Sequence, residues 1–151
     1  MFSIDTSALI WGKNTYPTDV SPGFWHSLEQ GISSGHLRAS EAVAFELEKK
    51  NDDVYKWAKA QNGLFVPIDG TIQTKVRAIL SSHPRLINLR KNKSGADPFV
   101  IALAMLGDGT VITQESKNGP GGAPQIPNVC GDLKIECLDV LGLFRKMKWV
   151  I

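Results

Sequence analysis

The chain has 151 residues, of which 42% are hydrophobic and 21% are charged. This length allows one domain with a buried core and is too short for two, so we expect a single domain over residues 1–151, and the composition excludes a disordered chain. The net charge of +2 is too small to indicate a polyanionic partner by itself.

The first half of the chain alternates short apolar segments with helical patterns. Residues 1–4 read as a buried strand, and Asp5-Thr6-Ser7 follow as residues that cap a helix. Pro67 favours the edge of a sheet for the last strand of this half. The pattern predicts, in order, a helix over 24–34, a strand over 36–39, a helix from the cap Ser40 through 50, a helix capped by Asn51, and a strand over 64–68.

The second half continues the alternation and contains one helix that is apolar on every side, over 96–106. Pro84 ends the helix that precedes it. The other predicted elements are a helix over 71–82, strands over 110–113 and 134–138, a Gly- and Pro-rich loop over 115–127, and a closing helix over 139–148. Short strands alternating with helices predict an α/β fold, a parallel sheet between two layers of helices.

Composition and spacing exclude several kinds of protein. The N-terminus lacks the cationic and apolar regions of a secretory signal. The longest apolar run, Phe99 to Leu106, is far shorter than the ~20 residues of a membrane-spanning helix. We therefore expect a cytoplasmic protein without membrane contact. Cys130 and Cys137 do not have zinc-ligand spacing, and we expect reduced thiols rather than a disulfide.

Four carboxylates stand where a short apolar strand or a helix begins or turns inward, namely Asp5, Glu46, Asp97 and Glu115. An unpaired buried carboxylate is costly, so four such acids suggest one shared counter-charge. Ligands of parallel sheets bind at the carboxyl ends of the strands, where these acids can converge. Oxygen ligands suit Mg²⁺ or Mn²⁺, and the usual chemistry of such a site is phosphodiester hydrolysis.

Each acid also has an ordinary explanation. Asp5 is a good helix cap, and Asp97 before a proline is a common helix start. Glu46 can be a half-exposed partner of Lys49 or Lys50, and a glutamate in a loop such as Glu115 is ordinarily solvated.

The stretch from Gly70 to Ala96 contains no Asp or Glu and leads directly into Asp97. A basic stretch beside a carboxylate site is typical of phosphate binding, and a solvated helical face is the alternative explanation. Its cations are Lys75, Arg77, Arg85, Arg90, Lys91 and Lys93, of which Arg85, Arg90, Lys91 and Lys93 are our candidates for RNA binding.

These acids and their order along the chain resemble the PIN-domain superfamily of metal-dependent nucleases, and more narrowly its bacterial toxin-type members. The resemblance spans nearly the whole chain, and its motifs are Met1-Phe-Ser-Ile-Asp-Thr-Ser7, Val43-Ala-Phe-Glu-Leu47, Ser94-Gly-Ala-Asp-Pro98 and Val111-Ile-Thr-Gln-Glu115. It implies a three-layer α/β/α sandwich with a central parallel sheet of about five strands in the order 3-2-1-4-5.

The resemblance also implies a function, that of a metal-dependent endoribonuclease. Asp5 and Asp97 would be the central ligands of Mg²⁺ or Mn²⁺, Glu46 would complete their surroundings, and Glu115 would bind a second ion. In the family this fourth acid is often Asp, whereas this chain has the longer side chain of Glu115. The hydroxyl side chains expected to orient these carboxylates are those of Thr6, Ser7 and Thr113.

The same resemblance implies a biological setting, the toxin of a toxin–antitoxin pair. RNA would be the substrate and a cognate antitoxin protein the partner, and a homodimer is allowed. Two other functions compete with it. Haloacid-dehalogenase phosphatases also begin with a strand ending in Asp, but they need a second Asp where this chain has Ser7. A non-catalytic PIN-like module that binds RNA or protein is the remaining alternative.

Overall fold

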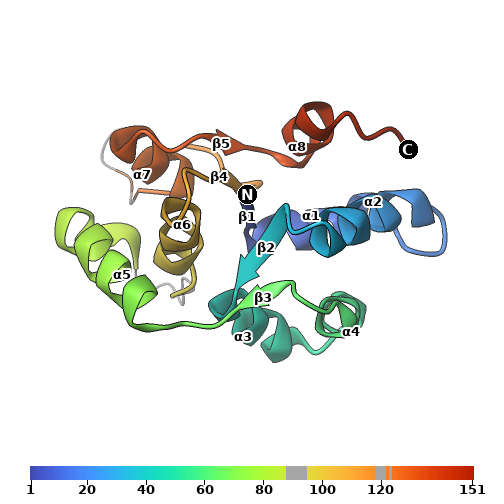
Figure 1. Ribbon diagram of the computed structural model, residues 1–151, viewed down its shortest axis with the longest axis horizontal. Helices are drawn as coiled ribbons and strands as arrows, with labels where there is room; N and C mark the ends of the chain where they lie inside the picture. Colours follow the sequence, from blue (N-terminus) through green and yellow to red (C-terminus); the bar gives the residue numbers. More distant parts are fainter. Residues whose placement is uncertain (88–94, 118–121, 123) are drawn as a thin grey trace.

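A computed structural model of the protein describes residues 1–87, 95–117, 122 and 124–151. Within these ranges the chain forms five strands and eight α-helices (Figure 1). The strands are β1 (Phe2–Ile4), β2 (Leu37–Ser40), β3 (Phe65–Val66), β4 (Thr110–Ile112) and β5 (Cys137–Leu138). The helices are α1 (Thr6–Thr15), α2 (Pro22–Ser33), α3 (Glu41–Lys50), α4 (Asp53–Ala60), α5 (Gly70–Ser82), α6 (Asp97–Met105), α7 (Ile126–Leu133) and α8 (Val140–Met147), with a 3₁₀ turn over Pro84–Leu86.

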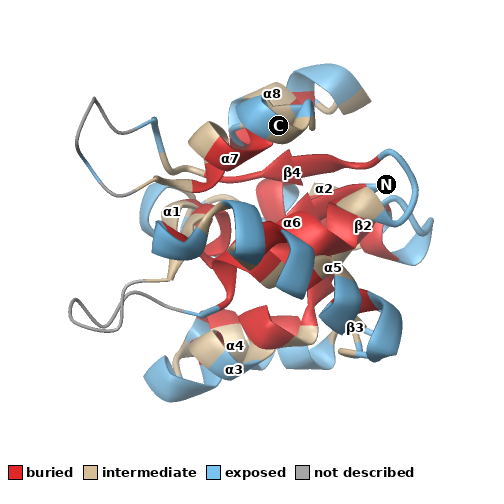
Figure 2. Ribbon diagram, turned by 90° about the vertical axis from the view of Figure 1, so that its left-hand side faces the viewer, coloured by how far each residue is buried: buried red, intermediate tan, exposed pale blue. Residues whose placement is uncertain are grey.

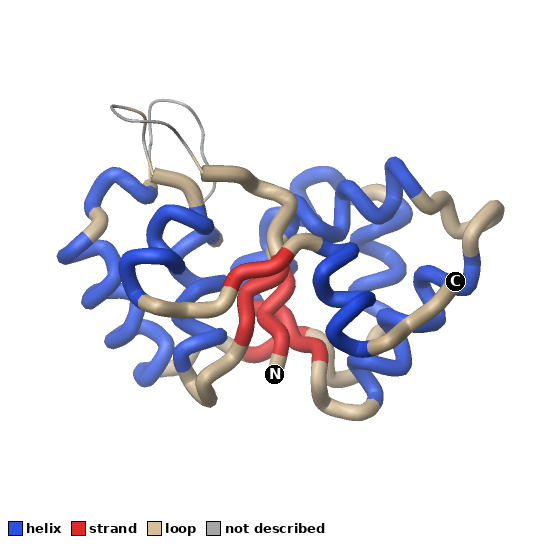
Figure 3. Tube along the Cα trace, turned by 90° about the horizontal axis from the view of Figure 1, so that it is seen from above, coloured by secondary structure: helices blue, strands red, loops and turns tan. Residues whose placement is uncertain are grey.

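The strands form one parallel sheet in the order β3-β2-β1-β4-β5. Parallel neighbours need a crossover, which here always contains helices. Such crossovers are right-handed. Strands β2 and β3 therefore extend from one edge of β1, strands β4 and β5 extend from its other edge, and the helices of the two groups cover opposite faces of the sheet. Helices α5, α6 and α7 lie on one side of the sheet and α1 and α2 on the other (Figures 1 and 3). The predicted three-layer α/β/α sandwich and its strand order are confirmed.

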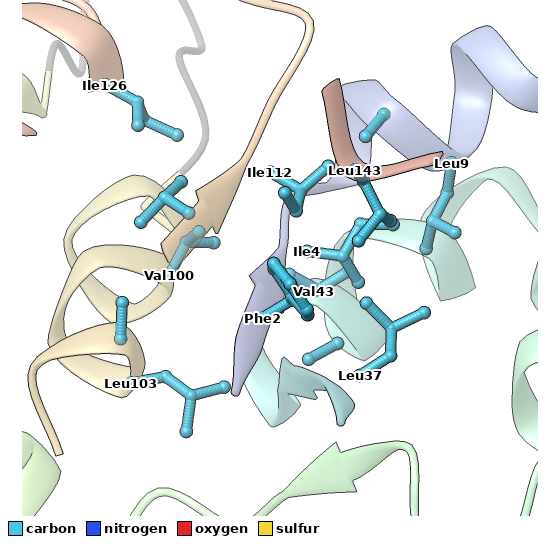
Figure 4. Close-up of a cluster of buried hydrophobic side chains, with 14 of the residues drawn as sticks. Phe2, Ile4, Leu9, Leu37, Val43, Val100, Leu103, Ile112, Ile126 and Leu143 are labelled. Carbon is cyan, nitrogen blue, oxygen red and sulfur yellow. The ribbon is translucent and has the colours of Figure 1, made fainter. Parts of the chain in front are cut away.

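The core lies on both faces of the sheet, and the central strands are buried throughout (Figure 2). Ile4 and Ile112 are paired across β1 and β4 and are 1% and 0% exposed. Side chains from both helical layers meet them, among them Val43, Val100 and Leu143 (Figure 4). A strand that is covered on both faces has a continuous apolar sequence rather than an alternating one. This explains why such short apolar segments form strands here.

The prediction for Asn51 was wrong. Asn51 does not begin the fourth helix but ends α3, in the left-handed conformation with φ of 44°. Asp52 is the true N-cap of α4, and its Oδ1 accepts hydrogen bonds from Val54 N at 3.1 Å and Tyr55 N at 3.3 Å. Asparagine tolerates the left-handed region at helix ends, so both roles were open to it from sequence.

Helix α7 was not predicted, and the strand after it is shorter than expected. Pro127 lies in the first turn of α7, a position where proline is favourable, so the proline-containing segment is compatible with a helix. Lys134, expected to begin a strand, instead ends α7 with φ of 57°. Strand β5 is therefore confined to Cys137–Leu138.

Both cysteines are free thiols, Cys130 buried in α7 and Cys137 half-buried in β5. In the described part of the chain, no helix has both the length and the apolar composition needed to cross a bilayer.

A turn at Gly109 sets the entry into β4, and it predicts a stability effect. A Cβ atom at this position would lie 2.8 Å from Met1 O and 3.0 Å from Ala104 O, and backbone atoms cannot move aside easily. Gly109→Ala should lower the free energy of unfolding by about 1–3 kcal/mol, measured by urea denaturation. Gly107→Ala is the matched control, because a Cβ there meets nothing within 4 Å. Equal effects of the two substitutions would contradict this packing.

Candidate active site at the carboxyl ends of β1 and β4

The site begins where the two central strands end side by side. Ile4 pairs with Ile112, so the next residues, Asp5 and Thr113, are neighbours across the strand ends. Asp5 N also donates to Ile112 O at 2.8 Å. The carboxyl edge of a parallel sheet is where ligands usually bind.

Asp5 is only 2% exposed, and neutral donors surround its carboxylate. Thr6 N donates to Oδ1 at 2.8 Å, while Ser7 Oγ at 2.7 Å and Thr113 Oγ1 at 2.8 Å donate to Oδ2. Burial raises the pKa of Asp5 above its ordinary value, and these hydrogen bonds offset only part of that rise. Within the described residues no lysine or arginine forms an ion pair with Asp5.

Helix α3 directs Glu46 toward the same edge. Val43 and Leu47 anchor the helix in the core, and Glu46 is half-buried beside them. Thr6 Oγ1 donates to Glu46 Oε1 at 2.8 Å. Thr6 therefore contacts two of the four predicted acids, Asp5 through its backbone and Glu46 through its side chain.

Asp97 is the first residue of α6 and is 4% exposed. Because α6 leads back toward a parallel strand, it runs antiparallel to the strands and starts at their carboxyl edge. One hydrogen bond fixes the position of α6 along the strand direction, because Ser3 Oγ in β1 donates to Val100 O in α6 at 2.7 Å. Asp97 lies three residues before Val100, roughly 4.5 Å along the axis of α6. Asp5 lies two residues after Ser3, roughly 6.6 Å along β1. Both displacements run toward the carboxyl edge of the sheet.

The environment of Asp97 differs from that of an N-cap. The residue before the helix is Ala96, so Asp97 stands within the first turn, where a negative charge interacts favourably with the helix dipole. Its Oδ2 atom is buried and accepts no hydrogen bond from a described residue, while the residue as a whole takes part in another interaction.

Glu115 lies three residues beyond β4 and is half-buried rather than solvated. Its Oε2 accepts a hydrogen bond from Ile126 N at 3.0 Å, at the start of α7. Its own backbone N donates to Thr113 Oγ1 at 3.1 Å. Glu115 thus connects to Asp5 through Thr113, and its side chain also stabilises a helix N-terminus.

Thr6 links Asp5 to Glu46 and Thr113 links Asp5 to Glu115, but the four acids do not form a closed metal cage among the described residues. Among the residues that the structure describes, no three His, Cys, Asp or Glu side chains are grouped closely enough to hold a metal ion. Mg²⁺ is usually bound by one or two carboxylates and keeps several waters, so Asp5 and Asp97 are a suitable donor pair for it. The donor chemistry fits a hard divalent cation.

The predicted basic segment is only partly described. Arg85 is exposed on the 3₁₀ turn after α5 and takes part in an interaction. Arg90, Lys91 and Lys93 lie outside the described residues.

Gln114 is a contributor that the sequence did not reveal. Its backbone N donates to Ser7 Oγ at 3.1 Å, and its Oε1 accepts from Val140 N at 2.8 Å, at the start of α8. A polar residue directly after a central strand was the available signal, because such positions face the site at the sheet edge.

Comparison with known proteins places the chain in a family. A family model described as "Domain of unknown function (DUF4411)" matches residues 2–151. The chain belongs to this family. No curated protein and no solved structure matches the chain. The residues matched by the DUF4411 model include every described strand and helix and the residues of the candidate site.

The raised pKa of Asp5 predicts a pH-dependent stability. The native state binds this proton more readily than the unfolded chain, so Asp5 lowers the free energy of unfolding as pH rises from the ordinary value of 3.8 through the raised pKa. In EDTA, Asp5→Asn should be more stable than wild type at pH 7, and the difference should shrink toward pH 4. Urea denaturation across this pH range measures it.

Asp108→Asn is the control for this prediction. Asp108 is exposed in a turn with φ of 49°, a conformation that asparagine adopts readily, and it should show no such trend. A wild type more stable than Asp5→Asn at pH 7 would contradict the cost assigned to the buried carboxylate.

Two substitutions at Glu115 separate its charge from its hydrogen bond to α7. Glu115→Gln keeps an oxygen acceptor for Ile126 N, whereas Glu115→Ala removes it and should cost about 1 kcal/mol of unfolding free energy. If Glu115 also binds a cation, both variants should lower the stabilisation by added Mn²⁺, measured by thermal melts. A wild-type response to Mn²⁺ in Glu115→Gln would restrict Glu115 to its structural role.

Proposed function

We propose that this protein is a metal-dependent endoribonuclease. The observation that carries the proposal is the burial of two carboxylates, Asp5 and Asp97, at the carboxyl edge of the central strands. They come from elements far apart in sequence, β1 and α6, and the contact between Ser3 and Val100 holds these elements together.

Asp5 caps α1 and Asp97 lies in the first turn of α6, but a cap does not require a carboxylate to be almost completely buried. Desolvation of a carboxylate costs several kcal/mol unless a counter-charge is supplied. Hydroxyl and amide donors surround Asp5, and no described cation neutralises it. A divalent cation from solution would supply the missing charge, and the resemblance to the PIN-domain superfamily names Mg²⁺ or Mn²⁺.

The roles of the chain's own residues follow from their contacts. Ser7 and Thr113 fix the orientation of Asp5 Oδ2, and Thr6 holds Glu46 beside it. A bound Mg²⁺ or Mn²⁺ would lower the pKa of a coordinated water and offset the negative charge of the phosphate. Such a site needs neither a covalent nucleophile nor a histidine base.

The biological role is proposed on the same resemblance. A toxin of a toxin–antitoxin pair would act on RNA in the cytoplasm and be held inactive by a cognate antitoxin, and it could form a homodimer. Arg85, with Arg90, Lys91 and Lys93, is proposed to contact the RNA backbone. The alternative remains a PIN-like module that binds RNA or protein without cutting.

The test is cleavage of single-stranded RNA by purified protein with Mn²⁺ or Mg²⁺. EDTA should abolish cleavage, and Asp97→Asn should reduce the rate at least about 100-fold, because even residues that only orient metal ligands contribute 10–100-fold. Asp108→Asn should cleave as wild type does. Cleavage that persists in EDTA or in Asp97→Asn would overturn the proposal.

Thermal melts of the same proteins distinguish a nuclease from a non-catalytic module. Mn²⁺ should raise the melting temperature of wild type and of Asp108→Asn, and should do so much less in Asp97→Asn. A metal response without cleavage would favour the non-catalytic alternative, and equal responses in all three would exclude Asp97 as a ligand.

A further inference from the structure

A pocket lies where the end of α1, the α1–α2 connection and α4 meet. Its volume is about 360 Å³, at the small end of the roughly 300–1,000 Å³ typical of ligand sites. The lining includes Pro17, Trp25, Val54 and Trp57 as apolar or aromatic walls. We call it the tryptophan pocket.

Both indoles line this pocket, but Trp25 is only 3% exposed, so the half-buried Trp57 offers most of the accessible aromatic surface. Trp25 and Trp57 pack edge to face with ring centroids 4.8 Å apart. Their N–H groups are already engaged, since Trp25 Nε1 donates to Tyr16 O at 2.7 Å and Trp57 Nε1 donates to Glu29 Oε1 at 3.0 Å. With both N–H groups engaged, the ring of Trp57 can attract a cation through its π-electrons but has no free hydrogen-bond donor for a ligand.

The charged residues of the lining leave an excess of negative charge. Lys13 is paired with Asp52 at 3.0 Å, and this hydrogen bond holds the pKa of Asp52 below its usual range. Asp19 and Asp53 also line the pocket, and within the described residues neither side chain makes an ion pair or hydrogen bond. Two exposed carboxylates without an ion-pair partner among the described residues therefore line the pocket, and the lysine of the lining, Lys13, is paired with Asp52.

We propose that the tryptophan pocket binds a guanidinium group. Guanidinium is planar, stacks on aromatic faces and is more weakly hydrated than an ammonium ion. Its N–H groups point outward in the plane of the cation, so one group can lie against an indole and donate to the carboxylates of Asp19 and Asp53. Guanidinium therefore combines in one group the stacking and the hydrogen bonding that this lining offers.

The pocket is independent of the proposed nuclease site. Lys13 lies seven residues along α1 from Thr6, roughly 10 Å along the helix axis. None of the four predicted acids lines the pocket. Binding here can be measured whether or not the protein cuts RNA.

The experiment compares N-acetyl-L-arginine amide with N-acetyl-L-citrulline amide, which has the same shape without the charge. Titrations of the full chain, followed by the indole ¹H–¹⁵N NMR signals, should move those of Trp25 and Trp57 and leave Trp149 unchanged. The arginine compound should bind at least about fivefold more tightly. Equal affinities, or no shift at Trp25 and Trp57, would overturn the proposal.

Variants locate the interaction. Asp19→Asn/Asp53→Asn should weaken arginine binding at least about fivefold with little effect on citrulline. Glu48→Gln removes one charge from an exposed position on α3 and should bind as wild type does. Trp57→Leu should abolish the preference for arginine, and the aspartate variant covers the case in which Trp57→Leu does not fold. Unchanged arginine affinity in the aspartate variant would overturn the proposal.

Free L-arginine is the third ligand and identifies the source of the guanidinium. It carries an α-carboxylate, which Asp19 and Asp53 repel, and an α-ammonium group, which they attract, whereas a blocked arginine has neither and resembles a residue within a chain. Tighter binding of the blocked compound points to an arginine of a protein segment, and tighter binding of the free amino acid points to a small molecule. Either result supports the pocket's chemistry.

Discussion

The buried carboxylate of Asp5 is the point on which the candidate site depends. It ends the central strand and accepts hydrogen bonds from α1 through Thr6 and Ser7 and from the end of β4 through Thr113. These donors fix its position but carry no charge, so they offset only part of the cost of desolvation. The fold thus holds a buried carboxyl group in place through neutral donors, and burial raises its pKa.

The segment Thr113-Gln114-Glu115 extends this arrangement to the helices after β4. Thr113 reaches Asp5, Gln114 accepts from the first residue of α8, and Glu115 accepts from the first residue of α7. Three successive side chains therefore tie a central strand end to two helix N-termini. Because each contact satisfies a helix N–H or a buried oxygen, the segment can stay ordered at the sheet edge although it is not part of a strand.

Packing in the core determines the position of Asp97 along the strand direction relative to Asp5. Helix α6 is buried on nearly every side, so its position is dictated by packing against β1 and β4 rather than by its own charges. The hydrogen bond from Ser3 to Val100 fixes the register of α6 on β1. Because the core is closely packed, fixing α6 at Val100 also fixes the position of its first turn. Asp97, in that turn, therefore lies beside the strand ends.

The local sequence determined most elements of this fold, because apolar runs, caps and breakers act within a few residues of one another. Residues 1–4, the cap Ser40, the edge strand with Pro67 and the apolar helix α6 were all predictable in this way. Where two local roles compete, sequence was insufficient. Asn51 ends one helix instead of starting the next, and α7 was hidden in a proline-containing segment.

The sequence also identified the four acids, and the family resemblance gave them an order, but their surroundings were decided by the tertiary structure. The pairing of Ile4 with Ile112 joins Asp5 to Thr113 across more than a hundred residues, and no local pattern encodes that contact. The same holds for the bond from Glu115 to α7 and for Gln114, since a helix N–H selects its acceptor only after the layers have packed. Local sequence fixes which groups are present, and long-range packing fixes which of them are buried together, because burial is a property of the assembled layers.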